Sequence, residues 1–290
     1  MDAKYSRRDV VKLLGTSLVA LPVIGCGGGE GTGTDGGSLA DAGALDGGPV
    51  EGVDAGDAGS VAEDGGTTPD GGVVTGWASG GTASMVDPDS YPNPFTAAAS
   101  CALYANSTLG PCFTSAPLRR DVSEGYPGLP VRLALQLLDA SCAPISGARL
   151  EIWHTRNSGL YSEGPTSFCT SGDADAEAHS YFRGSQVSDA DGLVAFDTCF
   201  PGWYSGRAIH IHFRAYRSDG GAATKVSQLF FPPALIEELF ASHVDYAEFG
   251  QPDTPNARDS IYSGVGTSGI VEYERMSDGA MLAWKQIRIV

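Results

Sequence analysis

The segment "PGWYSGRAIHIHF", residues 201–213, holds two histidines, His210 and His212, that are separated by a single residue. Because side chains at positions i and i+2 of a β-strand project to one face, both imidazoles can reach the same metal ion. The apolar residues on either side of them then face the core. The polar outer face of an ordinary strand gives the same pattern, so this spacing leaves metal binding open. Zinc or Fe(II) would require a third ligand such as His, Asp or Glu.

No other histidine or carboxylate is an obvious third ligand. His154 is expected on another strand as a packing or supporting group, and His179 in a polar loop. His243 ends the predicted helix, where a cation would complement the helix dipole. Glu151 and Asp197 are available carboxylates, but their positions on strands follow no recognisable ligand spacing.

The elements that position these residues are predicted to be mostly strands. Residues 131–137 alternate apolar with polar or small side chains, which is strand periodicity. Turn signals at 188–192 and elsewhere separate the other strands. These are expected within residues 148–154, 193–200, 208–216, 225–231, 270–276 and 281–290. The clear helix candidate is "PPALIEELFASHV", residues 232–244. The pattern predicts an all-β fold, a β-sandwich of mostly antiparallel strands with one or two short helices.

Residues 1–26 have the features of an export signal. Arg7 and Arg8 precede a short apolar run in the arrangement S-R-R-x-apolar-x-K, which favours the twin-arginine export route over an ordinary Sec signal. The run ends at "VIGC", which resembles a lipobox, so Cys26 is expected to carry lipid and tether the protein to a membrane. Plain cleavage nearby would instead leave a soluble periplasmic protein. We expect an exported bacterial protein in the periplasm or cell envelope.

Residues 27–84 are expected to form a disordered linker rich in Gly, Asp and Ala. Most of this segment, residues 27–72, lacks Lys, Arg and aromatic residues and cannot bury enough apolar surface to offset chain entropy. Much of the net charge of −17 lies here, so the acidity says little about the folded domain. No basic stripe indicates a nucleic-acid partner. Residues 85–290 then form one domain, which is long enough for a single core.

The domain has an odd number of cysteines, so at least one must lack a partner within it. They are Cys101, Cys112, Cys142, Cys169 and Cys199. Export permits disulfides, and we expect the pairs Cys101–Cys112 and Cys169–Cys199. No C-x-x-C pair indicates zinc.

Several motifs in order resemble the intradiol ring-cleavage dioxygenases, the family of catechol and protocatechuate dioxygenases. They are G-A-x-L-x-I-W-H, G-L-Y-S, F-R-G-x-Q, D-x-x-G-x-x-x-F and P-G-x-Y-x-G-R-x-x-H-I-H. The combination is far more specific than any single motif. The resemblance extends from about residue 110 to residue 231, and more loosely through "NARDSIYSG" to the end.

This resemblance implies a non-haem Fe(III) ion and insertion of both atoms of O2 into a small aromatic diol. The implied metal ligands are Tyr161, Tyr204, His210 and His212. Phenolate oxygen suits a hard, highly charged ion, and a strong Lewis acid lowers the pKa of a bound phenol far below about 10. Tyr204 would leave the metal when substrate binds and act as a base. Arg207 would stabilise developing negative charge, and Gln228 matches a family residue of the substrate pocket.

Two other readings remain open at this point. The chain could be a tethered, non-catalytic β-sandwich that binds sugar or protein and keeps a vestigial metal site. It could also be a zinc or copper protein that uses His210 and His212. The sequence lacks the N-terminal helical dimerisation segment of the catechol enzymes, and it predicts neither the oligomeric state nor which catechol is the substrate.

Overall fold

The computed structural model describes residues 76–96 and 102–289. The predicted export signal, the lipid site Cys26 and most of the predicted linker lie outside these residues. No helix in the described ranges is both long and apolar enough to pass through a membrane.

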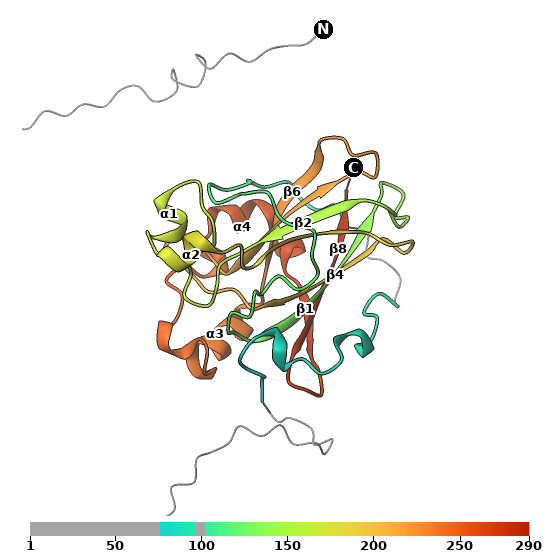
Figure 1. Ribbon diagram of the computed structural model, residues 1–290. Coiled ribbons are helices and arrows are strands. Elements are labelled where there is room, and N and C mark those ends of the chain that lie inside the picture. Colours follow the sequence, from blue (N-terminus) through green and yellow to red (C-terminus); the bar gives the residue numbers. More distant parts are fainter. Residues whose placement is uncertain (1–75, 97–101, 290) are drawn as a thin grey trace, which may run out of the picture. The chain divides into compact units, whose positions relative to one another are not determined.

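The described residues fold into two four-stranded sheets. Figure 1 shows their strands as arrows. The first has the order β4-β1-β8-β7 and the second β3-β2-β5-β6. Only the β1–β8 pair is parallel among these strand pairs, so the predicted, mostly antiparallel β-sandwich is confirmed. The first sheet contains β1 (Pro130–Leu138), β4 (Leu193–Cys199), β7 (Glu272–Arg275) and β8 (Met281–Arg288). The second contains β2 (Arg149–Trp153), β3 (Arg183–Val187), β5 (His210–Tyr216) and β6 (Ala223–Phe230).

The main core lies between the two sheets and follows the alternation of the strands. Val131, Leu133 and Leu135 of β1 are at most 1% exposed, and they pack with Ile211 and Phe213 of β5. The other face of β1 carries Arg132, which is also buried, because its cross-strand neighbour on β4 is a carboxylate with which it forms an ion pair.

One strand has no counterpart in the sequence prediction. β3 carries the sequence R-G-S-Q-V, in which no apolar alternation marks a strand. It forms because backbone pairing with β2 completes the edge of the second sheet. Here tertiary pairing overrides weak local preference.

In the part of the chain that the structure describes, four short α-helices lie on one side of the sheets, on the left in Figure 1. They are α1 (Ser167–Thr170), α2 (Ala174–Ala178), α3 (Pro233–Ser242) and α4 (Ser260–Val265). The predicted helix is confirmed as α3, which buries Leu235, Ile236, Leu239 and Phe240. The other three have six residues or fewer, too short to show a helical period. Short 3-10 turns, at Thr82–Ser84, Pro88–Ser90, Ala247–Phe249, Asn256–Arg258 and Thr267–Gly269, complete the fold.

Residues 76–84, which the sequence assigns to the linker, pack on the domain. The Trp77 indole N–H donates to Glu238 on α3 at 2.8 Å, and backbone N–H groups of Ala78 and Gly81 donate to Gly279 and Gly128. The packed part of the chain therefore begins before residue 85. Trp77 supplies the apolar surface that residues 27–72 lack.

The predicted disulfide pairs are wrong. Cys112 bonds to Cys169, and Cys199 is a buried free thiol. Cys142 is also disulfide-bonded, and Cys101 lies outside the described residues. Folding brings the loop before β1 against α1, which places Cys112 beside Cys169. The expectation that one cysteine of the domain remains free agrees with Cys199.

We predict that replacing both Cys112 and Cys169 by serine lowers the free energy of unfolding by about 4 kcal/mol, because the bond closes a long loop. The two residues are 57 positions apart in the sequence. Urea unfolding of the variant and the wild type, both without reductant, measures the difference. A loss below about 1 kcal/mol would contradict this loop-closure contribution.

Candidate metal centre

His210 and His212 lie at the start of β5 on the face turned away from the main core. Both are buried, at 3% and 2% exposure, whereas an ordinary polar outer face would be open to water. Their neighbours Ile209, Ile211 and Phe213 belong to the core, as the sequence predicts. The two imidazoles therefore line an enclosed site on the outer side of the second sheet.

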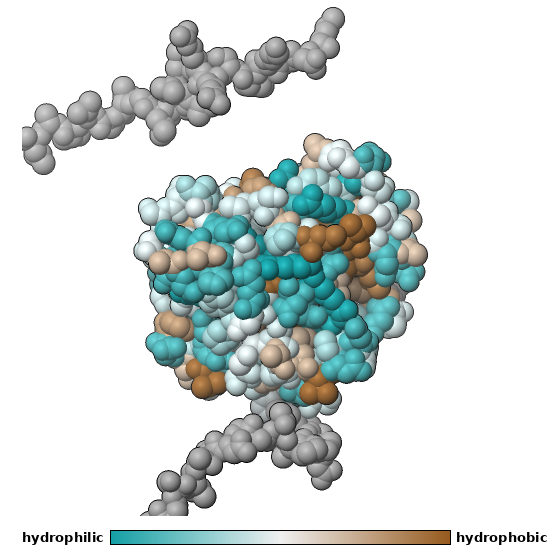
Figure 2. All heavy atoms as spheres, viewed as in Figure 1, coloured by the Kyte–Doolittle hydropathy of each residue, from teal (hydrophilic) through white to brown (hydrophobic). Residues whose placement is uncertain are grey.

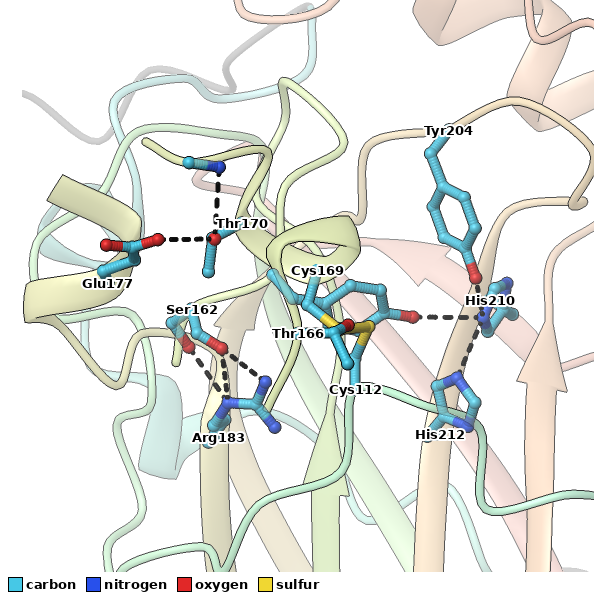
Figure 3. The surroundings of a disulfide bond; sticks show 12 residues. Cys112, Ser162, Thr166, Cys169, Thr170, Glu177, Arg183, Tyr204, His210 and His212 are labelled. Atoms are coloured by element: carbon cyan, nitrogen blue, oxygen red, sulfur yellow. Dashed lines mark hydrogen bonds between the residues drawn. A yellow bond between two sulfur atoms is a disulfide. The ribbon is translucent and has the colours of Figure 1, made fainter. Parts of the chain in front are cut away.

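Two tyrosine hydroxyls converge on the same imidazole nitrogen (Figure 3). The Oη atom of Tyr161 lies 3.3 Å from Nε2 of His210, and the Oη atom of Tyr204 lies 3.5 Å from the same nitrogen. Nε2 of His212 lies 3.1 Å from Nε2 of His210. Tyr161 comes from the loop after β2, and Tyr204 from the loop that leads into β5. The structure thus brings together all four residues that the resemblance implies as ligands.

Burial keeps both imidazoles neutral. It lowers the pKa of His210 to about 3, with the nearby Arg207 charge adding to the effect. Burial and the neighbouring His210 hold the pKa of His212 well below its ordinary value. Nδ1 of His210 lies 2.6 Å from the backbone oxygen of Ala208, so this nitrogen carries the proton and Nε2 presents its lone pair to the site. Neutral imidazoles with oriented lone pairs are the form that metals bind.

Burial also raises the pKa of both phenols, that of Tyr161 well above its ordinary value and that of Tyr204 less strongly. For Tyr204 the nearby Arg207 opposes the increase. A bound cation reverses this tendency, because its charge favours the phenolate form. The four atoms could therefore hold a metal ion.

A row of directly paired residues on four neighbouring strands supports this cluster. Arg183, Trp153, His212 and Gln228 are consecutive partners across β3, β2, β5 and β6. Directly opposed residues project to the same face, so the other three side chains lie on the same face of the sheet as His212. The Trp153 ring stacks on His212 with centroids 4.8 Å apart and planes at 10°. The guanidinium of Arg183 lies 5.9 Å from the centre of the Tyr161 ring.

The loop that contains Gly110 covers His212 from the other side. Gly110 has φ of +75°, and a Cβ at this position would lie 2.9 Å from Cε1 of His212. Only glycine tolerates this approach and this backbone conformation. The Cys112–Cys169 disulfide then joins the loop to α1, and the backbone oxygen of Cys169 accepts a hydrogen bond from the Tyr161 N–H at 3.0 Å. Figure 3 shows this disulfide together with Tyr204, His210 and His212.

Arg207 and Gln228 lie together, as their shared functional prediction requires. The guanidinium Nη2 of Arg207 donates to Oε1 of Gln228 at 2.5 Å, and Nε donates to Oδ2 of Asp259 at 2.8 Å. Among the described residues, Nε2 of Gln228 has no hydrogen-bond partner, although it is buried. It remains available to a ligand.

Sequence reasoning did not assign a role to Asp259. Its buried carboxylate caps α4 through the N–H groups of Ile261 and Tyr262 and accepts from Arg207 and from the N–H of Ala208. Burial alone would raise its pKa, but these hydrogen bonds outweigh burial and lower the pKa. The available signal was its position before the short helix in "NARDSIYSG", where Asp is a favoured cap.

The remaining sequence candidates lie outside this cluster. His154 is fully buried between Thr155 O and Thr198 Oγ1, and its low pKa, about 3, results from burial. This confirms a packing role. His179 ends α2 and His243 ends α3. The carboxylates are paired with other groups, Glu151 with Arg149 and Tyr216, and Asp197 with Arg132 and Arg120.

In the ranges 76–96 and 102–289, no group of three or more His, Cys, Asp and Glu side chains could hold a metal ion. The cluster described above has only two histidines, and its other two donors are phenols. Any metal site here must therefore be one that accepts tyrosine oxygen.

A pocket of about 420 Å³ borders the cluster. Tyr161 and Tyr204 form part of its wall. The other residues that line it are Ser158, Gly159, Leu160, Phe168, Cys169, Ser171, Trp203, Ser205 and Phe249. A small ligand that enters this pocket reaches the two tyrosines.

Comparison with known proteins agrees with this site and fold. Residues 110–233 match the family described as Dioxygenase. The structure of an intradiol ring-cleavage dioxygenase from Tetranychus urticae aligns with a TM-score of 0.58 and 26% identity, covering 65% of this chain and 95% of that one. A second dioxygenase structure aligns with the same TM-score and 27% identity, covering 66% and 95%. No curated protein matches the chain significantly.

The fold and the matched segment define an oxidoreductase of the dioxygenase class. More specifically, residues 110–233 are similar to the dioxygenase family and the described fold is similar to that of an intradiol ring-cleavage dioxygenase, which confirms the resemblance seen in the sequence.

We predict that Asp259→Ser lowers the free energy of unfolding by about 3 kcal/mol at pH 7, because serine still caps α4 but leaves Arg207 without its buried partner. The lowered pKa of Asp259 means that its contribution is present above about pH 4 and is lost as pH falls through the folded-state pKa. The difference between variant and wild type should therefore shrink at pH 3, as measured by urea unfolding at both pH values.

Asp173→Ser is the matched control. Asp173 caps α2 through the Ala176 N–H, but its partner Arg156 lies 3.3 Å away in a partly exposed ion pair. This change should cost less than about 1 kcal/mol. Equal losses of unfolding free energy in the two variants would show that the buried contact with Arg207 adds nothing to stability.

Proposed function

We propose that the protein is a non-haem Fe(III) dioxygenase that inserts both atoms of O2 between the hydroxyl-bearing carbons of a catechol, giving a muconate-type diacid. The observation that carries this proposal is the convergence of the buried Tyr161, the half-buried Tyr204 and two neutral histidines on one point. The family and fold support ring-cleaving dioxygenase chemistry in general.

The donor set fits Fe(III). Tyr161 and Tyr204 offer oxygen atoms that become anionic beside a cation, and two phenolates neutralise two of the three charges of the ion. His210 and His212 add neutral nitrogen donors whose low pKa values keep them unprotonated. Zinc or copper sites use imidazole readily but do not require two phenols, so this set favours iron over those alternatives. When bound, Fe(III) would supply a Lewis acid that binds the catechol oxygens and withdraws electron density from the ring.

The protein's own residues would accept the substrate's protons and stabilise the negative charge that develops on the ring. Tyr204 is more exposed than Tyr161, so it is the phenol better placed to move aside and accept a proton from an incoming catechol. Arg207 is held by Asp259 and Gln228, which fixes its positive charge beside Tyr204. A fixed guanidinium stabilises negative charge that develops on the reacting ring. The free N–H of Gln228 can donate to the substrate.

The complete set of four donors argues against a tethered, non-catalytic binding module with a vestigial site. In such a module selection would not maintain a buried cluster of polar groups, because burial of polar atoms is costly.

We predict that the iron-loaded protein is reddish, because tyrosinate-to-Fe(III) charge transfer absorbs visible light, and that it consumes O2 with catechol. Tyr204→Phe should shift or bleach the band and lower kcat about 100-fold or more through loss of the base. Visible spectra and an oxygen electrode measure both effects.

Tyr273→Phe is the control for that experiment, because Tyr273 lies on β7 in the other sheet. It should leave colour and O2 uptake unchanged. A colourless iron-loaded protein that takes up no O2 with catechol, protocatechuate, hydroxyquinol or alkylcatechols would refute the proposed activity.

We further propose that the enzyme is exported by the twin-arginine route and anchored in the cell envelope through lipid on Cys26. The S-R-R motif and the "VIGC" sequence support this. Export of an already folded chain would allow iron to bind before translocation.

We predict that Cys26→Ser moves the protein from the membrane fraction to the soluble fraction, because one lipid-bearing residue provides the tether. Cell fractionation with immunoblotting measures this. Arg7→Lys with Arg8→Lys should retain the protein in the cytoplasm if the twin-arginine route is used. Unchanged fractionation of the Cys26→Ser variant would contradict the lipid anchor.

A further inference from the structure

We propose that the pocket beside Tyr161 and Tyr204 receives an uncharged, apolar ring substituent of the substrate and discriminates against catechols that carry a carboxylate. This inference rests on the proposed function, since it assumes that the catechol ring binds at the tyrosine pair. It concerns which catechols are accepted.

The lining of this pocket is mostly apolar and contains no charged side chain. None of its eleven lining residues is Asp, Glu, Lys, Arg or His. The walls include the side chains of Leu160, Phe168, Trp203 and Phe249, and the polar groups among the rest are hydroxyls and backbone atoms. Pockets of this kind gain affinity mainly from apolar contact.

The cations nearest to the cluster are already engaged. Arg207 is held by Asp259 and Gln228, and Arg183 lies fully buried beneath the Tyr161 ring, where it donates to Ser162. Neither residue lines the pocket. A carboxylate placed in the pocket would lose water without gaining an ion pair, and burial of an unpaired charge is strongly unfavourable.

The aromatic walls also have room for more than a single ring. The pocket holds about 420 Å³, within the range of sites that bind drug-sized ligands. Phe168 is 62% exposed at the pocket wall and meets the Tyr204 ring edge-on, with centroids 6.1 Å apart. An exposed large aromatic side chain next to a reactive centre is well placed to pack on a ligand. A phenyl or alkyl group on the catechol ring would gain this contact.

Most other large apolar residues on the surface lie apart from the pocket. Among the described residues those exposed are Val86, Leu103, Leu118, Val187 and Val244, and none of them lines it. The face drawn in Figure 2 is mainly hydrophilic or neutral, with separate apolar patches. Phe168 therefore differs from them in bordering a pocket beside the cluster.

A matched pair of ligands tests the proposal. 3,4-Dihydroxybenzoate and its methyl ester have similar size and differ in charge. Calorimetry of the iron-loaded protein under argon measures binding alone, because cleavage requires O2. The wild type should bind the ester at least about tenfold more tightly than the acid, and 4-phenylcatechol more tightly than catechol. Equal binding of acid and ester, or no binding of either, would overturn the proposal.

Phe168→Lys adds a cation to the pocket wall at an exposed position. It should shift the ratio of acid to ester affinity by about threefold toward the acid and weaken the preference for 4-phenylcatechol. Leu118→Lys adds the same charge at a residue that is 73% exposed and lies outside the pocket, so it should leave the ratio unchanged. An equal shift in both variants would assign the effect to overall charge and overturn the proposal.

Oxygen uptake separates this inference from the proposed function. If the iron-loaded wild type does not consume O2 with catechol, the proposed activity fails whatever the binding ratios are. If it consumes O2 with catechol but treats acid and ester alike in binding, the activity stands and the pocket assignment fails.

Discussion

The register of the second sheet is the constraint on which the site depends. β5 pairs with β2 on one side and β6 on the other, so Trp153, His212 and Gln228 lie in one cross-strand row. A shift of one residue would turn His210 and His212 into the main core and expose Ile211 and Phe213. The register is fixed because these apolar residues are buried between the sheets. The core therefore determines where the two imidazoles point.

This sheet is unusual in being covered on both faces. Its inner face packs on the first sheet, and its outer face carries a second small core made of Cys112, Trp153, Tyr161 and Cys169. That outer cover is what buries His210, His212 and Tyr161. Burial keeps the imidazoles neutral and the phenols protonated until a cation is present, so the same packing that excludes water prepares the donor atoms. The Cys112–Cys169 bond ties this cover together without relying on a large apolar area.

The charged groups beside the site are held in place by contacts at its edge. Asp259 caps α4 and holds Arg207, and Arg207 in turn holds Gln228. A single carboxylate thus couples the C-terminal part of the chain to the residues beside Tyr204. The pocket next to the tyrosines has no such charged group in its lining, so the two sides of the cluster differ in polarity. One side is suited to stabilising charge, and the other to holding an apolar group.

The sequence by itself determined the sandwich, the helix α3 and the shared face of His210 and His212, because these follow from local periodicity. It identified Tyr161, Arg207 and Gln228 only through resemblance to a family, since nothing in their local pattern distinguishes them from packing residues. Tertiary structure alone decided the strand β3, the Cys112–Cys169 pairing and the role of Asp259. Each depends on contacts between segments far apart in the chain, since the two cysteines are 57 positions apart and Arg207 and Asp259 are 52 positions apart. The local sequence determines the periodicity of each helix or strand. The packing of the whole chain determines which loops come together over a sheet.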